Sequence, residues 1–201
     1  MTKLQTTITL IVFVALTVFG FNQYQNTQKN VGKSNAERIK GNSKAVLNIV
    51  EYIDFQCPSC AYGSKLLSET MAAYPDLIQL ELKYFPLGMH KHAFVASRYA
   101  ECALRQGKFW EFHDKVLSQQ KSWKNMINVF PAFDLFIDDE GINNSEFRQC
   151  LDDPKVEAVI NKHKAQGKSL GVRSTPTYFV NGEMIVGSKF LKDKIDAQLA
   201  Q

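Results

Sequence analysis

The sequence lacks any long run of basic residues and any large excess of charge. Its 24 lysines and arginines are scattered among 20 acidic residues, which leaves a net charge of +4. Proteins that bind nucleic acids usually gather basic side chains in one segment or on one face, so we expect no nucleic-acid partner. The 201 residues also contain no internal repeat and no low-complexity block. The length fits one ordinary domain with short appendages.

Charged side chains are missing from residues 4–21, and Ile8 to Phe19 is almost wholly apolar. That length lies between the apolar core of a signal peptide and a full membrane span. The pattern of small residues at which signal peptidases cut is not clear near the end of the segment. We therefore expect residues 1–24 to be an uncleaved membrane anchor, with a cleaved signal segment as the alternative.

Apolar side chains are scarce in the next part of the chain. Residues 25–44 are rich in Asn, Gln, Lys and Ser, which predicts a solvated linker before a domain at 45–201. Basic residues are more frequent after the apolar segment than before it, and this count alone would keep the domain in the cytoplasm. Large domains cross membranes largely regardless of such charges. The side of the membrane is therefore inferred from the chemistry of the domain.

Cysteine is scarce, with four residues in the chain, yet Cys57 and Cys60 stand three positions apart in FQCPSC. A structural zinc site normally uses two such pairs, or one pair with closely spaced histidines. The other two cysteines stand alone, so we expect no metal. A bond between Cys57 and Cys60 would close a loop too small to constrain the unfolded chain strongly. A redox-active disulfide is therefore favoured over a metal site and over a structural bond.

The residues between the two cysteines support this interpretation. Pro58 suits the first turn of a helix, where its missing N–H group would have no partner. Cys57 would then lie at the helix N-terminus, where free N–H groups and the positive end of the helix dipole lower a thiol pKa. Cys60 follows about one turn later, within reach of a disulfide. The spacing predicts an exposed, activated Cys57 and a shielded Cys60 that resolves mixed disulfides.

Hydrophobic periodicity surrounds the cysteine pair with a strand–helix–strand unit. The patterns predict a strand at 45–55, a helix at 61–73 and a second strand at 77–85. If the two strands are parallel, the crossover between them is right-handed.

The remainder of the chain is predicted to be mostly helical. Residues 88–170 have helical patterns, with a break or kink at Pro131. Asn181-Gly182 then marks a hairpin between two short apolar strands, and a last helix covers about 190–199.

Four segments, in this order, resemble the DsbA-like thiol–disulfide oxidoreductases of the thioredoxin superfamily. They are FQCPSC at 55–60, FPLGMH at 85–90, AECALRQGKFWEFHD at 100–114, and GVRSTPTYFVNG with the following IVG at 171–187. The resemblance covers about residues 46–199. It implies an α/β protein with a thioredoxin-like fold, in which a helical block is inserted between the second and third core strands. It also implies disulfide exchange without a cofactor.

The resemblance assigns residues around the cysteine pair. It implies that Pro176 is cis and faces the disulfide, although the segment alone favours an ordinary trans proline. It implies that Thr175 lies beside the disulfide and that Pro58 and Ser59 support the active site. The best-known strong oxidants of the family carry histidine where this chain has Ser59. We therefore expect a redox couple between about −270 and −120 mV.

Cys102 and Cys150 fall on two helices of the predicted helical block. An even number of cysteines in an exported domain favours pairing, and some members of the family look to carry a second, structural disulfide. Two buried free thiols are the alternative.

Glu51 and Asp54 lie on the strand that leads to Cys57. A buried carboxylate below the disulfide could relay a proton to the resolving cysteine. Exposed charges at the end of a strand are the more ordinary interpretation, and the sequence alone favours it.

These observations predict a disulfide-forming oxidase that acts on exported, cysteine-containing proteins. The domain would lie outside the cytoplasm, at the periplasmic or cell-envelope face of the membrane, or would be secreted if the amino-terminal segment is cleaved. A membrane redox partner would reoxidise the cysteine pair, and the protein is expected to be a monomer. A reductase or isomerase of the same fold is the alternative. A copper(I)-binding module is less favoured, because no methionine or histidine cluster lies near the cysteines in the sequence.

Overall fold

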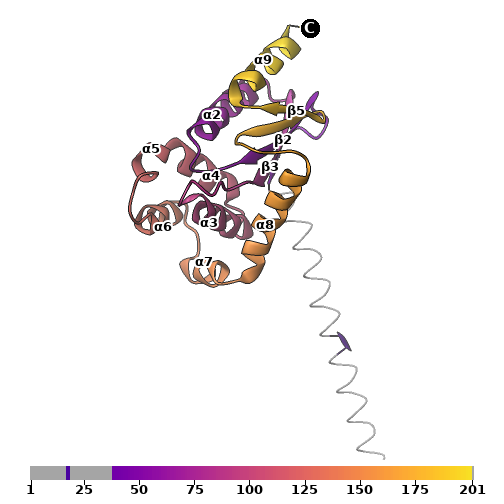
Figure 1. Ribbon diagram of the computed structural model, residues 1–201. Coiled ribbons are helices and arrows are strands. Elements are labelled where there is room, and N and C mark those ends of the chain that lie inside the picture. The colour runs from indigo at the N-terminus through magenta and orange to yellow at the C-terminus, as the bar shows by residue number, and fades with distance from the viewer. Residues whose placement is uncertain (1–16, 19–37, 201) are drawn as a thin grey trace, which may run out of the picture. The chain divides into compact units, whose positions relative to one another are not determined.

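The computed structural model describes residues 17, 18 and 38–200 (Figure 1). The chain divides into a segment at 1–36 and a compact unit at 37–201. Thr17 and Val18 are helical and exposed, and the rest of the expected anchor at 1–24 lies outside the described residues. Within the described part of the chain, no helix is both long enough and apolar enough to span a bilayer.

A five-stranded mixed sheet forms the centre of the compact unit. Its strands are β1 (Ile39–Gly41), β2 (Leu47–Ile53), β3 (Ile78–Tyr84), β4 (Thr177–Val180) and β5 (Glu183–Val186), in the spatial order β1-β3-β2-β4-β5. Strands β2 and β3 are parallel, whereas the other pairs are antiparallel. The predicted hairpin joins β4 to β5. Its turn residues Asn181 and Gly182 have φ angles of 50° and 87°, as a tight two-residue turn requires.

Helices pack on this sheet and extend beyond it. Helix α2 (Pro58–Ala73) connects β2 to β3, and α9 (Ser188–Leu199) packs beside α2. Between β3 and β4 the chain forms a block of helices, which are α3 (Ala93–Arg105), α4 (Phe109–Ser118), α5 (Gln120–Trp123), α6 (Phe130–Asp139), α7 (Asn144–Leu151) and α8 (Pro154–Ser169). Figure 1 shows α3, α6 and α7 gathered at the far end of the unit from α9. The predicted helical insertion between the second and third core strands is therefore confirmed.

The ordered domain begins earlier than the sequence predicts. The predicted linker extends to residue 44, but Ile39–Gly41 forms β1 and pairs antiparallel with β3. Arg38, just before this strand, is buried and forms an ion pair with Glu101 of α3. Three residues with one apolar side chain show no alternation, so the strand could not be recognised from its pattern. Backbone pairing and the buried ion pair hold it in place.

The break predicted at Pro131 is the start of a helix. Helix α6 begins at Phe130 and carries Pro131 in its first turn, where proline is tolerated because its missing N–H group has no partner to lose.

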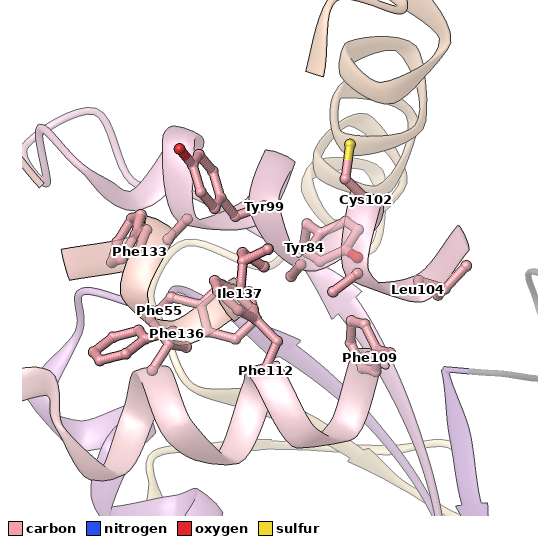
Figure 2. Close-up of a cluster of buried hydrophobic side chains, with 14 of the residues drawn as sticks. Phe55, Tyr84, Tyr99, Cys102, Leu104, Phe109, Phe112, Phe133, Phe136 and Ile137 are labelled. Carbon is pink, nitrogen blue, oxygen red and sulfur yellow. The ribbon is translucent and has the colours of Figure 1, made fainter. Parts of the chain in front are cut away.

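An aromatic core fills the helical block and reaches the ends of two strands (Figure 2). Tyr99 of α3 contacts Phe112 of α4 and Phe133 of α6, with ring centroids 6.2 and 5.3 Å apart. Phe55, two residues before the cysteine pair, and Tyr84, at the end of β3, belong to the same buried cluster. Burying one large aromatic side chain contributes about 1.5–3 kcal/mol. The core therefore fixes the chain immediately before the cysteines.

A disulfide joins two helices of the block. Cys102 of α3 and Cys150 of α7 are bonded, with a Cα–Cα distance of 5.7 Å and a sequence separation of 48 residues. Neither is bonded to Cys57 or Cys60, which are free thiols.

Removing this disulfide should destabilise the domain without touching the other cysteine pair. In the chain-entropy model, a bond that closes a loop of this size stabilises the fold by about 4 kcal/mol. We expect the Cys102→Ala/Cys150→Ala variant to lose about that much free energy of unfolding in a urea titration. The alkylation rate of Cys57, measured on the folded variant as the control, should equal that of the wild type. A loss below about 1 kcal/mol would contradict the expectation.

Candidate functional site

The two closely spaced cysteines lie where β2 leads into α2. Cys57 directly precedes the helix, Pro58 is in its first turn, and Cys60 follows one turn later. Pro58 and Ser59 are exposed, whereas Cys60 is fully buried. Cys57 is 7% exposed, which is more covered than the sequence predicts.

A loop from the end of the helical block covers Cys57. Pro176 follows a cis peptide bond after Thr175, directly before β4. In its thiol form, the Sγ atom of Cys57 donates to the carbonyl oxygen of Thr175 over 3.3 Å. The structure thus brings together two segments that lie more than 110 positions apart in the sequence.

The two thiols differ strongly in acidity. A hydrogen bond from the Cys60 thiol is the largest cause that lowers the Cys57 pKa, to about 5. Burial opposes this effect, while the Thr175 side chain and the backbone N–H groups of Cys60 and Ser59 add to it. For Cys60, burial raises the pKa well above its ordinary value, and the bond to Cys57 raises it further. At neutral pH the reduced pair therefore holds one thiolate and one thiol.

Side-chain amides hold the backbone of the motif against the helical block. Gln120 is buried, and its Nε2 donates to the carbonyl oxygens of Phe55 (2.8 Å) and Cys57 (2.9 Å). The Nε2 of Gln56 donates to the carbonyl oxygen of Lys124 (2.7 Å). Gln120 lies on a four-residue helix, which has no hydrophobic pattern, so the sequence offered no signal for its role.

Asp54 is buried, which contradicts the interpretation as an exposed charge. Its Oδ1 accepts from the backbone N–H of Gln56 (2.7 Å), and its Oδ2 accepts from the backbone N–H of Leu87 (2.8 Å). The Nδ1 of His90 lies 2.8 Å from the same Oδ2. Because both oxygens are engaged, Asp54 fixes the loop after β3 against the start of α2.

Glu51 is also fully buried, so the exposed interpretation is wrong for this residue too. Neither of its carboxylate oxygens meets the geometry of a hydrogen bond with the residues that the structure describes, although the Tyr178 hydroxyl is close enough to stabilise the charged form. Burial raises the Glu51 pKa to about 8, and the Cys57 charge adds to the shift, while Lys40 and Tyr178 oppose it. The Glu51 charge in turn contributes to the raised pKa of Cys60. Glu51 is therefore a buried acid that is coupled to both cysteines.

Lys40 of β1 is the cation that faces this buried acid. Its Nζ lies 4.1 Å from the centre of the Trp110 ring, a distance at which a cation is attracted to the ring face. Burial lowers the Lys40 pKa, while Asp114 and Glu51 raise it. The sequence does not indicate this role, because its composition predicts that Lys40 lies in the linker.

The side chains of this site are suited to acid–base chemistry and to thiol–disulfide exchange. Within residues 38–200 and at residues 17 and 18, no three His, Cys, Asp or Glu side chains are grouped to hold a metal ion. The site offers one thiolate, one buried thiol in contact with it, and one buried carboxyl with a pKa near neutrality. This set can exchange a disulfide while a proton moves to or from the second sulfur.

Comparisons with known proteins agree with this fold. A family model described as Thioredoxin matches residues 33–197. Among curated proteins, the Na(+)/H(+) antiporter NhaA of Herminiimonas arsenicoxydans is 31% identical over 152 residues, 76% of this chain and 23% of that protein. The Na(+)/H(+) antiporter NhaA 3 of Salinispora tropica is 30% identical over 149 residues, 73% of this chain and 22% of that protein. The chain thus spans less than a quarter of these relatives.

Solved structures show the same arrangement over nearly their whole length. BdbD from Bacillus subtilis superposes with a TM-score of 0.68 at 20% identity, covering 82% of this chain and 93% of that one. The thiol-disulfide exchange protein alpha-DsbA2 from Wolbachia pipientis superposes with a TM-score of 0.66 at 19% identity, and the match covers 88% of this chain and 98% of that one. A periplasmic thioredoxin-like protein from Salmonella enterica serovar Typhimurium superposes with a TM-score of 0.65 at 21% identity, and the match covers 81% of this chain and 90% of that one. The chain therefore belongs to the thioredoxin family, and it has the thioredoxin-like fold of the DsbA-like proteins.

Proposed function

We propose that the protein is a thiol–disulfide oxidoreductase that forms disulfides in cysteine-containing proteins outside the cytoplasm. The observation that carries the proposal is the contact between Cys57, with a pKa of about 5, and the buried Cys60, whose pKa is raised. Exchange needs a thiolate to attack or to leave, and a large difference in acidity assigns the two roles to different sulfurs. The fold shared with a thiol-disulfide exchange protein of Wolbachia pipientis supports the same chemistry.

In the oxidising direction, a substrate thiolate attacks the Sγ atom of Cys57 in a Cys57–Cys60 disulfide. The bond between the two protein sulfurs breaks, and Cys60 leaves with the electron pair. Glu51 is protonated at neutral pH because its pKa is about 8, and it gives its proton to the Cys60 thiolate. A second substrate thiolate then attacks the mixed disulfide and releases Cys57 as a thiolate. The substrate gains a disulfide, and the protein gains two electrons.

The acidity of Cys57 favours this direction. A stabilised thiolate lowers the free energy of the reduced protein, and this makes its disulfide a stronger oxidant. The Cys57 pKa of about 5 lies between those of the nucleophilic cysteines of thioredoxin, about 7, and DsbA, about 3.5. The reduction potential should therefore fall between about −270 and −120 mV. A measured potential at or below the thioredoxin value would favour a reductase instead.

The location and partners follow from the same chemistry. A stable disulfide such as Cys102–Cys150 is typical of proteins outside the reducing cytoplasm, and one protein of the same fold is described as periplasmic. A monomeric domain held near a membrane would be reoxidised there by a redox partner that accepts two electrons. The antiporter activity of the curated relatives is not proposed for this chain, because the match covers less than a quarter of them.

Alkylation of the reduced protein as a function of pH tests this proposal. The rate of iodoacetamide addition to Cys57 should have a midpoint near pH 5, whereas Cys60 should stay unmodified because it is buried and protonated. The Cys60→Ala variant is the matched control. It lacks the hydrogen bond that lowers the Cys57 pKa most, so its midpoint should move upward toward the ordinary value of about 8.5. Equal reactivity of the two thiols, or a midpoint near 8.5 in the wild type, would refute the proposed roles.

A further inference from the structure

Two hydroxyl groups connect the buried acid to the start of α2. Glu51 and Tyr178 are direct partners in the β2–β4 register, so their side chains lie on the same face of the sheet. The Tyr178 hydroxyl lies 3.3 Å from the Oγ of Ser188, the first residue of α9. Ser188 Oγ donates to the carbonyl oxygen of Ser59 over 2.9 Å. The chain of groups thus runs from the Glu51 side of the sheet to the exposed end of the cysteine motif.

The hydrogen bonds define which way each proton points. Ser188 has a single hydroxyl proton, and it is used on the Ser59 carbonyl oxygen. Tyr178 must therefore donate in its contact with Ser188. With its proton directed there, the Tyr178 hydroxyl lies near enough to Glu51 to lower its pKa but forms no hydrogen bond of ordinary geometry with either Glu51 oxygen. The arrangement suits a Glu51 that is protonated.

A glycine in α2 makes room for this contact. A Cβ atom at Gly63 would lie 2.1 Å from the Tyr178 hydroxyl oxygen and 2.7 Å from Ser188 Oγ. Both hydroxyl groups therefore press directly against the helix that carries the cysteines, and larger residues at this position are excluded by them.

When Glu51 ionises, its carboxylate becomes a stronger hydrogen-bond acceptor for the Tyr178 hydroxyl group. A buried carboxylate without a donor is costly, and a hydrogen bond to a charged oxygen is stronger than one between neutral groups. Among the described residues, the groups that face Glu51 are Lys40 of β1, Tyr178 of β4, Cys57 at the N-cap of α2 and Cys60 within that helix. Asp114 and His113 of α4 interact with Lys40. Of these groups, Tyr178 carries a neutral donor that can rotate toward Glu51.

We propose that the Tyr178 hydroxyl is a switchable donor, shared between Ser188 and Glu51, that turns to Glu51 when this residue has given its proton to Cys60. The switch moves no electrons and breaks no covalent bond. One hydrogen bond, to Ser188 Oγ, is exchanged for another, to the Glu51 carboxylate. Tyr178 and Ser188 are thus positioning residues, and their part in the reaction rests on the function proposed above. Ser188 holds the donor away from Glu51 while Glu51 is neutral.

The switch predicts opposite effects for the two hydroxyl groups. Tyr178→Phe removes the donor, so the Glu51 titration should move upward by about one to two pH units. Ser188→Ala frees the Tyr178 proton for Glu51, so the titration should move downward, by about half a unit or more. The double variant should behave like Tyr178→Phe, because Ser188 acts through Tyr178. If the two hydroxyl groups had a merely structural role, the two substitutions would not shift the Glu51 titration in opposite directions.

The titration can be measured on the reduced protein by infrared spectroscopy of the protonated carboxyl group. The Glu51 band is assigned by its loss in Glu51→Gln. Tyr52→Phe is the matched control, because it removes a buried hydroxyl without a hydrogen-bond partner among the described residues from the opposite face of the sheet. It should leave the titration unchanged. Shifts of the same sign for Tyr178→Phe and Ser188→Ala, or no shift for either, would overturn the switch.

This readout does not depend on the activity of the protein. If the Cys57 alkylation profile refutes the proposed function, the infrared shifts still decide whether the switch exists. If alkylation supports the function and the shifts are missing, the switch fails alone. When both hold, the pH midpoint for resolution of a mixed disulfide by Cys60 should follow the infrared midpoint in each variant.

Discussion

Replacing Cys60 by alanine is expected to leave the protein covalently joined to its substrates through Cys57. Exchange passes through a mixed disulfide, which in the wild type is resolved by the second substrate thiolate or, in the opposite direction, by the neighbouring thiol of Cys60. In the Cys60→Ala variant the Cys57 thiolate can still attack a disulfide of a substrate, but the neighbouring thiol that would release the adduct is absent. The Cys60→Ala variant, expressed in its own host with a purification tag, should therefore accumulate adducts that disappear on reduction.

The matched control is Cys57→Ala, which should collect essentially no adducts. Identification of the trapped proteins by mass spectrometry then tests the proposed location. Exported proteins with several cysteines would support the oxidase, whereas cytoplasmic proteins would replace it with a reductase that faces inward. Equal trapping by the two variants would exclude Cys57 as the nucleophile.

The local signals of the sequence predicted much of this site. A proline after Cys57 selects the helix N-terminus because of its missing N–H group, and α2 does begin at Pro58. The Asn181-Gly182 pair predicted the hairpin because both residues tolerate positive φ angles. Such features depend on a few adjacent residues, so they can be recognised without knowledge of the tertiary structure.

Burial of the charged residues could not be predicted in the same way. Glu51 occupies a position in β2 whose neighbours are apolar, and strand alternation alone does not say that α2 and α9 cover its face of the sheet. The charge that lowers its pKa comes from Lys40, on an edge strand only three residues long. Gln120 likewise reaches the cysteine motif across more than 60 positions. These roles depend on tertiary contacts between segments that carry no pattern of their own.

The stability of the reduced protein, compared with that of the Cys57–Cys60 disulfide form, should rise steeply with pH. In the folded reduced protein the Cys57 pKa is about 5, and in the unfolded chain it is about 8.5. Between these values the unfolded state binds one more proton, so the free energy of unfolding increases with pH. This contribution is fully present above about pH 8.5 and is lost as pH falls through 5. The unfolding constant should change by up to about tenfold per pH unit.

Urea titrations of both forms at several values between pH 5 and 8 measure this difference, with Cys102–Cys150 kept intact by mild reduction. The contribution of Glu51 to the free energy of unfolding has the opposite pH dependence, because its folded pKa of about 8 lies above the unfolded value of about 4.3. Its contribution is present below about pH 4.3 and is lost as pH rises through 8. Glu51→Gln removes the influence of this residue from both forms, so this variant is the control background. A difference between the two forms that stays constant with pH in that background would mean that Cys57 is not a thiolate at neutral pH.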